Sequence, residues 1–247
     1  ILTDGTRAPE EYYYFGRDEA FLDICALSDH PELYLTDYMW DYLTAVTNGF
    51  NNPGRFVTLQ AFEWTNIFRA NPGVPVAGHR CLYFPSDKVP FIRSTDPKYS
   101  TLESMHKFVR ENGGLAIPHH TARKFSPADW SMNIDNEVER LLEVYSAWGT
   151  SEKPVGPDHF RTIKGGEHEG SFLVDALKKG LKYGIMASGD IHYGRPGHQF
   201  ERRNDGKKIY HGLMGVWADK LDRESVFEAM WNRRVYGTTG TRTILRF

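Results

Sequence analysis

Cysteine is scarce in this chain, and long apolar runs are absent from it. The 247 residues include two cysteines, Cys25 and Cys81, each inside an apolar, strand-like stretch. We expect both to be buried free thiols rather than a disulfide, and two cysteines exclude a metal site made of thiolates. A transmembrane helix needs about 18 consecutive apolar residues. No such run is present, so we expect a soluble protein with no membrane partner.

An excess of one charge sign is also missing. The formal net charge is −2, whereas a nucleic-acid-binding surface usually shows a basic excess. A nucleic-acid partner is therefore not favoured. Hydrophobic residues make up 40% and charged residues 25%, which is typical of a globular protein. The length suits one large α/β domain over residues 1–247. Because the chain starts at Ile1 and stops inside a predicted strand, we expect a fragment of a longer protein.

Apolar strand-like runs alternate with segments of helical periodicity. The sequence predicts helices over 8–20, 35–48, 100–112, 171–182 and 222–233. It predicts strands over 22–27, 55–62, 80–84, 115–118, 138–146, 184–188 and 212–218. This alternation indicates an α/β fold with a mainly parallel sheet, open or closed into a barrel. His106, inside a predicted helix, is expected to be solvated.

Acidic and histidine side chains recur where predicted strands end. The segment Met186–Gly194 presents Asp190 and His192, which project to the same side because they are two residues apart in an extended chain. An ordinary polar loop pair is the alternative. Similar residues are Asp29, His30, Glu63, His119 and His120, while His79 begins a strand. The carboxyl ends of parallel strands share one face, where sites are built. Mixed histidine and carboxylate ligands suit Zn, Mn or Fe(II), and two such ions suit hydrolysis.

These motifs resemble those of the PHP (polymerase and histidinol phosphatase) superfamily, and most closely a bacterial branch of unknown function, DUF3604. Any single motif is weak, but together they span nearly the whole chain in the expected order. The matching segments are Leu2–Gly5, Ala26–His30, Phe62–Thr65, Gly78–His79, Gly113–His120, Leu142–Ser146, Ser188–His192 and Tyr236–Gly240.

The resemblance implies a distorted (β/α)7 barrel that carries two or three divalent ions, Zn, Mn or Fe. By similarity, Glu63 would bridge two ions, and His79 with one of His119 and His120 would complete one site. A second site would use Asp4, His30 and His192, and a third would use Asp190. For Asp4, the Asp-Gly pair is equally a turn signal. Asp29 would orient a histidine, and Glu143 would line the barrel mouth.

One family feature is absent from the chain. PHP domains begin with a His-x-His strand just before the Asp-Gly turn, and residue 1 lies only three positions ahead of Asp4. We expect this N-terminal strand to be missing through truncation. Loss of one metal site, and with it of activity, is the alternative.

The favoured function is a metal-dependent phosphoesterase in which metal-activated hydroxide attacks a small anionic phosphate ester, with Glu63, Asp190 and His192 as catalytic residues. Arg195, Thr239 and Arg242 are candidates for substrate binding, because arginine pairs well with phosphate; solvated surface positions are the alternative. Trp64 and Trp148 are expected to pack in the core. Alternative functions are amidohydrolase-like cleavage of a non-phosphate bond and a metal-stabilised, non-catalytic domain.

Overall fold

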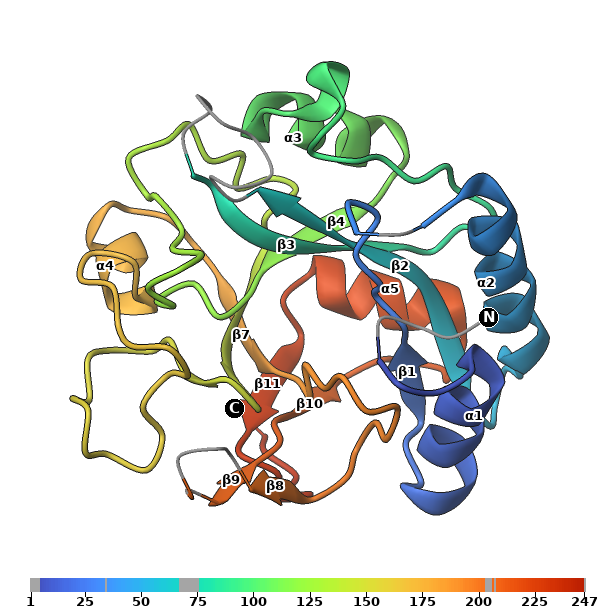
Figure 1. Cartoon of the computed structure of the whole chain (residues 1–247). Coiled ribbons are helices and arrows are strands. Elements are labelled where there is room, and N and C mark those ends of the chain that lie inside the picture. The colour runs from blue at the N-terminus through green and yellow to red at the C-terminus, as the bar shows by residue number, and fades with distance from the viewer. Residues whose placement is uncertain (1–4, 34, 67–75, 203–205, 207, 247) are drawn as a thin grey trace.

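A mixed α/β fold is seen in the computed structural model, which describes residues 5–33, 35–66, 76–202, 206 and 208–246. Strands lie at the centre and helices around them (Figure 1). The helices are α1 (Pro9–Tyr14, continued by a π-helical turn over Phe15–Glu19), α2 (Asp37–Phe50), α3 (Leu102–Glu111), α4 (Leu173–Lys178) and α5 (Arg223–Trp231). The strands are β1 (Ile24–Ala26), β2 (Val57–Asn66), β3 (Gly78–Phe84), β4 (Leu115–Pro118), β5 (Leu141–Ser146), β6 (Gly149–Thr150), β7 (Gly184–Ala187), β8 (Phe200–Arg202), β9 (Lys208–Tyr210), β10 (Leu213–Val216) and β11 (Val235–Thr238).

The central strands form a mixed rather than a mainly parallel arrangement. One sheet has the order β1-β2-β3-β4, and others pair β6-β5-β7, β10-β11 and β8-β9. β1–β2 and β5–β7 are parallel, but β2–β3 and β3–β4 are antiparallel. The prediction of a mainly parallel sheet is therefore wrong over β2 to β4. Asn66 pairs with Gly78 in antiparallel register, and an antiparallel pair does not require the helical crossover that parallel strands need.

The described strands do not close into a barrel. A groove separates the edge of β1 from the edge of β10, since Ile24 from β1 and Met214 from β10 both line it. Elsewhere the sheets follow one another closely: β4 lies beside β5, and β7 lies beside β11. The α/β class is thus confirmed, while the predicted (β/α)7 barrel is not.

Alternation along the strands gives the interior two chemically different ends. Leu59 and Glu63 on β2 are an even number of residues apart, so they face the same side, and both line one interior cavity of about 190 Å³. Ile117 of β4 and His119 just beyond it are likewise an even number of residues apart, and Met186 of β7 and Asp190 both line the same cavity. Apolar side chains therefore fill one end of the interior, and acids and histidines gather at the other.

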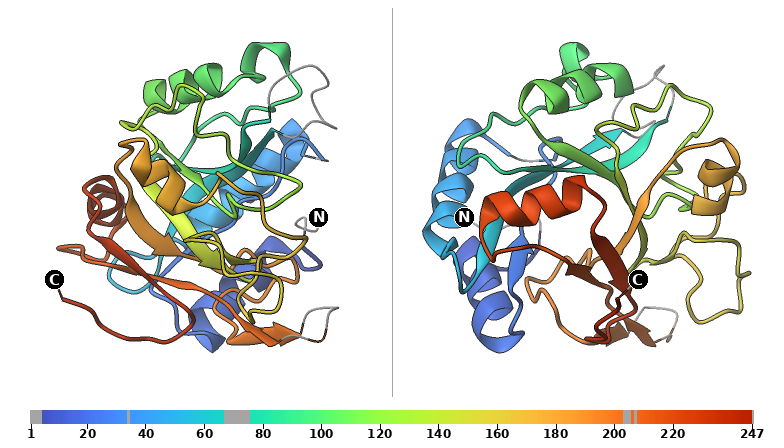
Figure 2. Two further views of the ribbon diagram at one scale, coloured as in Figure 1. Left: turned by 90° about the vertical axis from the view of Figure 1, so that its left-hand side faces the viewer. Right: turned by 180° about the vertical axis from the view of Figure 1, so that it is seen from behind.

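Aromatic packing and capped helices hold the outer layer. Trp40 of α2 and Phe108 of α3 pack on Phe62 and Phe84, which face outward from β2 and β3. The N-terminus of α5 is capped, because the Asp222 side chain accepts a hydrogen bond from the Ser225 amide. Figure 2 shows α5 lying across the back of the strands. None of the helices within the described ranges combines the length and apolarity needed to cross a bilayer.

A buried ion cluster joins β3, α3 and the segment just before β5. Arg80 and Glu139 are fully buried, with Arg80 Nε 2.9 Å from Glu139 Oε1. His106 is also buried, and its Nε2 lies 2.8 Å from the same oxygen, so the prediction that His106 is solvated is wrong. Burial alone would raise the pKa of Glu139, but the charge of Arg80 and the contacts with His106 lower that pKa to about 2.

We expect Glu139→Gln to lower the free energy of unfolding by about 3–5 kcal/mol, because it leaves Arg80 buried without its counter-charge. The contribution of Glu139 is full above pH 4.5, its ordinary pKa, and is lost as the pH falls toward 2. Urea denaturation at several pH values measures both effects. Glu137→Gln, in an exposed pair with Arg140, is the control and costs less than about 1 kcal/mol. Equal losses in the two variants would contradict the prediction.

Candidate metal centre

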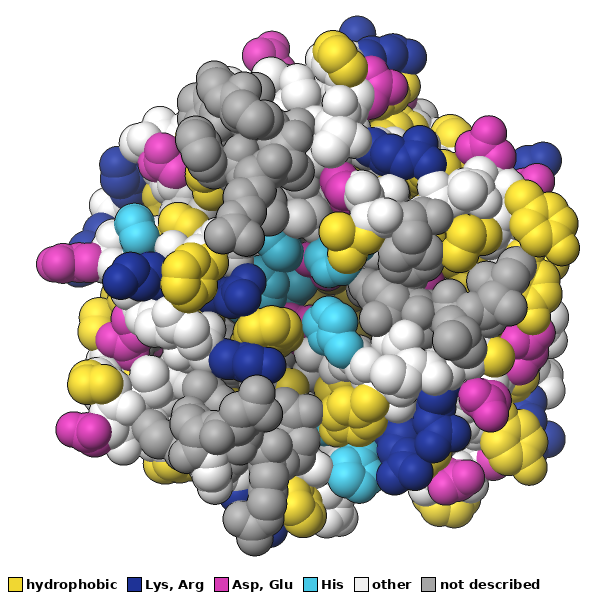
Figure 3. All heavy atoms as spheres, in the orientation of Figure 1, with side chains coloured by type: hydrophobic (Ala, Val, Ile, Leu, Met, Phe, Trp, Pro, Cys, Tyr) yellow, Lys and Arg dark blue, Asp and Glu magenta, His cyan; other side chains and the backbone are white. Residues whose placement is uncertain are grey.

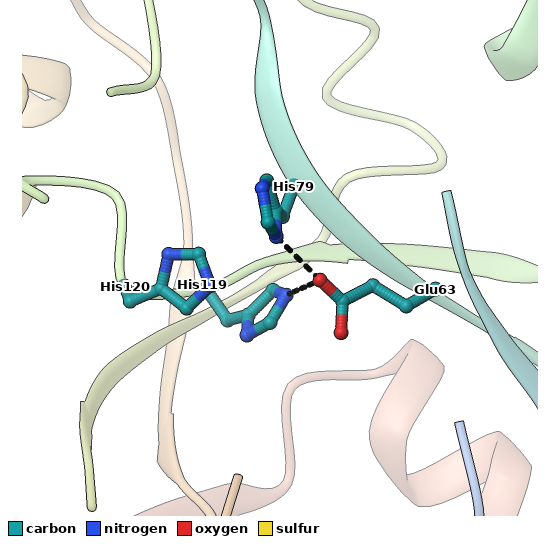
Figure 4. A group of neighbouring side chains, drawn as sticks. All are labelled: Glu63, His79, His119 and His120. Atoms are coloured by element: carbon teal, nitrogen blue, oxygen red, sulfur yellow. Dashed lines mark hydrogen bonds and ion pairs between the residues drawn. The ribbon is translucent and has the colours of Figure 1, made fainter. Parts of the chain in front are cut away.

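The carboxylate of Glu63 is surrounded by imidazole nitrogens. Glu63 Oε1 lies 2.5 Å from His79 Nδ1, 3.1 Å from His119 Nε2 and 3.5 Å from His30 Nδ1. Figure 4 shows His79 and His119 directed at this one oxygen, with His120 beside them. Glu63, His79, His119 and His120 are all buried, and one ligand atom from each lies within 4.8 Å of the others.

Two consecutive histidines reach this cluster because the backbone bends between them. In a strand, neighbouring side chains point to opposite faces, yet the rings of His119 and His120 are only 4.1 Å apart between centroids. His120 has a φ of +34°, in the left-handed region that residues with a Cβ seldom adopt. Asp190, at φ +45°, has the same kind of strained backbone.

A second group of ligand atoms shares His119 with the first. His119 Nδ1 lies 3.2 Å from Asp190 Oδ2, and His119, Glu143 and Asp190 form a set of possible metal ligands within 4.8 Å of one another. Glu143 Oε2 accepts a hydrogen bond from the Ser188 hydroxyl. Glu143 is thus part of the cluster itself, although it was predicted only to line the mouth.

Electrostatics set the charge of each group. Burial alone would raise the pKa of Glu63, but the charges of His30 and His119 hold it well below its usual range. Burial lowers the pKa of His79 and of His120, which favours neutral imidazoles. For His119, burial is outweighed by contacts with Cys81, Glu63 and Asp190, which raise its pKa. Burial raises the pKa of Glu143 to about 7.

The donor set fits divalent cations. His79 Nε2 and Glu143 Oε1 are buried and have no hydrogen-bond partner among the described residues, a costly situation unless another group satisfies them. His119 faces a carboxylate oxygen at each ring nitrogen. Without an ion, the raised pKa of His119 favours an imidazolium that donates to both oxygens. A bound cation would take the place of one of these two protons. Histidine and carboxylate are the ligands that Zn, Mn and Fe take.

The other predicted ligands lie at the outer side of the cluster. His30 Nδ1 is 2.6 Å from the Thr65 hydroxyl, and the ring of His30 is 6.4 Å from that of His192 between centroids. His192 is exposed. Asp29 is buried, and its carbonyl accepts a hydrogen bond from the Glu63 amide, so it helps to position β2. Asp4 lies outside the described residues.

The cluster opens on one face of the molecule. Figure 3 shows histidine side chains at the centre of this face, with acidic side chains between them and hydrophobic and basic side chains alongside. Trp148 lies at this opening rather than in the core, because it is only partly buried and its ring is 5.7 Å from that of His120. Arg123 approaches the ring of Trp148 to 4.5 Å. The sequence did not single out Arg123, because it lies in a loop without periodicity and its role depends on packing against Trp148.

The three residues predicted to bind substrate lie elsewhere. Arg195, Thr239 and Arg242 do not line the interior cavity beside the cluster. The Arg242 guanidinium donates to the carbonyl oxygens of Ala20 and Phe21, and Arg195 lies over the ring of Phe15. Arg242 and Thr239 line a separate surface groove. Their role in substrate binding stays a prediction.

A family model for proteins of unknown function, DUF3604, matches residues 16–153 and 198–247. The chain belongs to this family. The matched residues include Glu63, His79, His119 and His120, whereas Asp190 and His192 lie in the unmatched segment between the two matched ranges. The match also takes in the predicted DUF3604 motifs between Ala26 and Ser146 and the one at Tyr236–Gly240.

Proteins with similar sequences match nearly the whole chain but are themselves uncharacterised. Uncharacterised proteins of Chlamydia pneumoniae, Chlamydia muridarum and Chlamydia trachomatis are 28%, 29% and 29% identical over 95% of this chain. The chain spans 37% of the length of each. In fold it is similar to a crystal structure from Bacteroides vulgatus, described as a two-domain protein containing a predicted PHP-like metal-dependent phosphoesterase. The TM-score is 0.57 at 16% identity, covering 96% of this chain and 61% of the other.

The strained backbone at His120 gives a test of the local geometry. In metal-free protein we expect His120→Gly to be more stable than His120→Ala by about 1 kcal/mol, because glycine adopts a positive φ without the Cβ clash. Urea denaturation measures the difference. The same pair of changes at exposed Lys107 inside α3 is the control and should have the opposite sign. An alanine variant at 120 as stable as the glycine variant would show that the left-handed geometry is wrong.

Proposed function

We propose that this chain is a metal-dependent hydrolase domain that acts on phosphate esters. The observation that carries the proposal is the pair of ligand groups, joined through His119 and buried except for partly exposed Asp190, at the polar end of the strands. Similarity in fold to a protein described as containing a predicted PHP-like metal-dependent phosphoesterase supports the same class. A single domain over residues 1–247 and a distorted (β/α)7 barrel belong to the same proposal.

The ligands would be divided between two ions, with a third as the expected maximum. Glu63, His79, His119 and His120 would hold one ion, and Glu143 and Asp190 would hold another near His119. His30 and His192 would add ligands at the outer side, and Asp4 stays a predicted ligand. When bound, the ions would acidify a water and neutralise the charge that develops on the phosphate. Zn, Mn and Fe all suit this ligand set.

The protein's own residues would orient and enclose the reaction. The Asp190 carboxylate, 3.2 Å from His119 Nδ1, would fix the tautomer and direction of that imidazole. Ser188 in turn fixes the Glu143 carboxylate. His192 is the exposed histidine of the set, so it would lie where a substrate enters. Apolar residues such as Leu59 and Met186 line the cavity behind the cluster and would keep bulk water out.

Glu63→Gln tests the proposal. We expect bound metal, measured by mass spectrometry of the purified protein, to fall and chelator-sensitive hydrolysis of p-nitrophenyl phosphate to drop by at least about 100-fold. Glu103→Gln, an exposed change on α3, is the control and keeps both values. Unchanged turnover in Glu63→Gln would overturn the mechanism. Cleavage of amides or lactones without any phosphate ester would favour the amidohydrolase-like alternative.

Metal removal gives a second, independent readout. A ligand that binds only the folded state adds about 4 kcal/mol when present at 1,000 times its Kd. For a chain of this length, we therefore expect chelation to lower Tm on the order of 10 °C, and added Zn or Mn to restore it. If Tm changes neither when a chelator is added nor when metal is added back, the result would contradict the metal centre. Metal-dependent stability without turnover of any ester would favour a non-catalytic domain.

A further inference from the structure

Two basic side chains share one tryptophan ring beside the histidine cluster. Arg123 Cζ and Lys164 Nζ each lie 4.5 Å from the centroid of the Trp148 ring. The same ring is 5.7 Å from that of His120 and 5.9 Å from that of His192. Cation–π attraction holds a guanidinium or ammonium at such a distance. Trp148 therefore places two positive charges next to the candidate metal centre.

Backbone contacts fix this arrangement. The Lys164 amide donates to the Trp148 carbonyl at 2.6 Å, and the Lys124 amide donates to the Gly166 carbonyl at 2.9 Å. The loop can come this close because residue 149 is glycine: a Cβ there would lie 2.7 Å from Ile163 Cα, and the φ of Gly149 is +115°. The segments that carry Arg123, Trp148 and Lys164 are thus tied together before any ligand arrives.

Neither cation is in direct contact with a negative charge within the described parts of the chain. No described carboxylate forms an ion pair with Arg123 or Lys164, and Arg123 Nε is buried without a hydrogen-bond acceptor among the described residues. Because both charges lie 4.5 Å from the same centroid, they are separated by at most twice that distance and repel each other. An anion bound between them or beside them would remove this repulsion and satisfy the unused donors.

The two cations lie at different depths. Arg123 is partly buried, and its Nη1 is 3.4 Å from the Ser126 hydroxyl, which lies 3.5 Å from His120 Nδ1. The negative charges of Asp190 and Glu63 also act on its guanidinium. Lys164 is exposed. A phosphate held at the cluster would therefore meet Arg123, whereas Lys164 would meet a more distant part of the substrate.

We propose that the substrate carries two anionic groups: a phosphate ester bound by Arg123 at the metal centre, and a carboxylate or second phosphate on the leaving group bound by Lys164. This rests on the proposed function. Water supplies the new oxygen on phosphorus, the ester P–O bond breaks, and the leaving oxygen takes a proton. The second anion passes unchanged into the released alcohol or phenol. Arg123 and Lys164 then determine which esters the site accepts.

Two matched esters test the proposal on metal-loaded protein: phenyl phosphate and 4-carboxyphenyl phosphate. We expect wild-type kcat/KM to favour the carboxylated ester by about fivefold, the effect of one largely solvated ion pair. Lys164→Met should bring that ratio to about one. Arg123→Met should lower kcat/KM for both esters by about tenfold or more without altering the ratio. Lys124→Met removes an exposed charge that has no contact with Trp148, so it should behave as wild type.

Metal content, measured for every variant, separates loss of substrate recognition from loss of the centre. The proposal is overturned if wild type shows no preference for the carboxylated ester, or if Lys164→Met keeps that preference at full metal content. If metal-loaded wild type hydrolyses neither ester, the proposed function fails, and calorimetric binding of the same two compounds decides the present inference. Tighter binding of the carboxylated ester, lost in Lys164→Met, would support it, and equal binding would refute it.

Discussion

The convergence of imidazole nitrogens on the Glu63 carboxylate is the constraint on which the site depends. A buried carboxylate and buried imidazoles are costly unless each finds a partner. Here Glu63 Oε1 is approached by His79, His119 and His30. His119 also contacts Asp190 through its other ring nitrogen. One oxygen therefore connects β1, β2, β3 and β4 with the segment after β7. Loss of any of these partners would leave a polar group buried and unsatisfied.

Strand periodicity explains how such a centre coexists with an apolar core. Residues two apart on a strand face the same side, so each inward-facing row runs from an apolar residue to a polar one. Leu59 leads to Glu63, and Ile117 leads to His119. The apolar parts pack against β10, β11 and α5 in a cluster that includes Met186 and Phe227. The change from apolar to polar occurs at the same level on several strands, so the polar residues meet as one group.

Much of this arrangement could be predicted from the sequence, because the signal is local. An acid or histidine at the end of a predicted apolar strand can be recognised in the sequence, as Glu63, His119, His120 and Asp190 can. The partners at the opening could not be found this way. Arg123 and Lys164 lie in loops without periodicity, and they matter only because both loops pack on Trp148. His106 shows the same limit, since its helical position gave no sign that Arg80 and Glu139 of other elements would bury it.

Sheet direction was the other feature that local patterns did not determine. The spacing of strand-like runs along the chain does not show whether two neighbouring strands run parallel or antiparallel, and β2 and β3 are antiparallel. This direction has a consequence for the site. In a parallel pair, ligands would come from the same end of each strand, but here Glu63 lies near the end of β2 and His79 near the start of β3. Antiparallel pairing brings these two positions together, which is why a histidine that begins a strand belongs to a cluster otherwise built from strand ends.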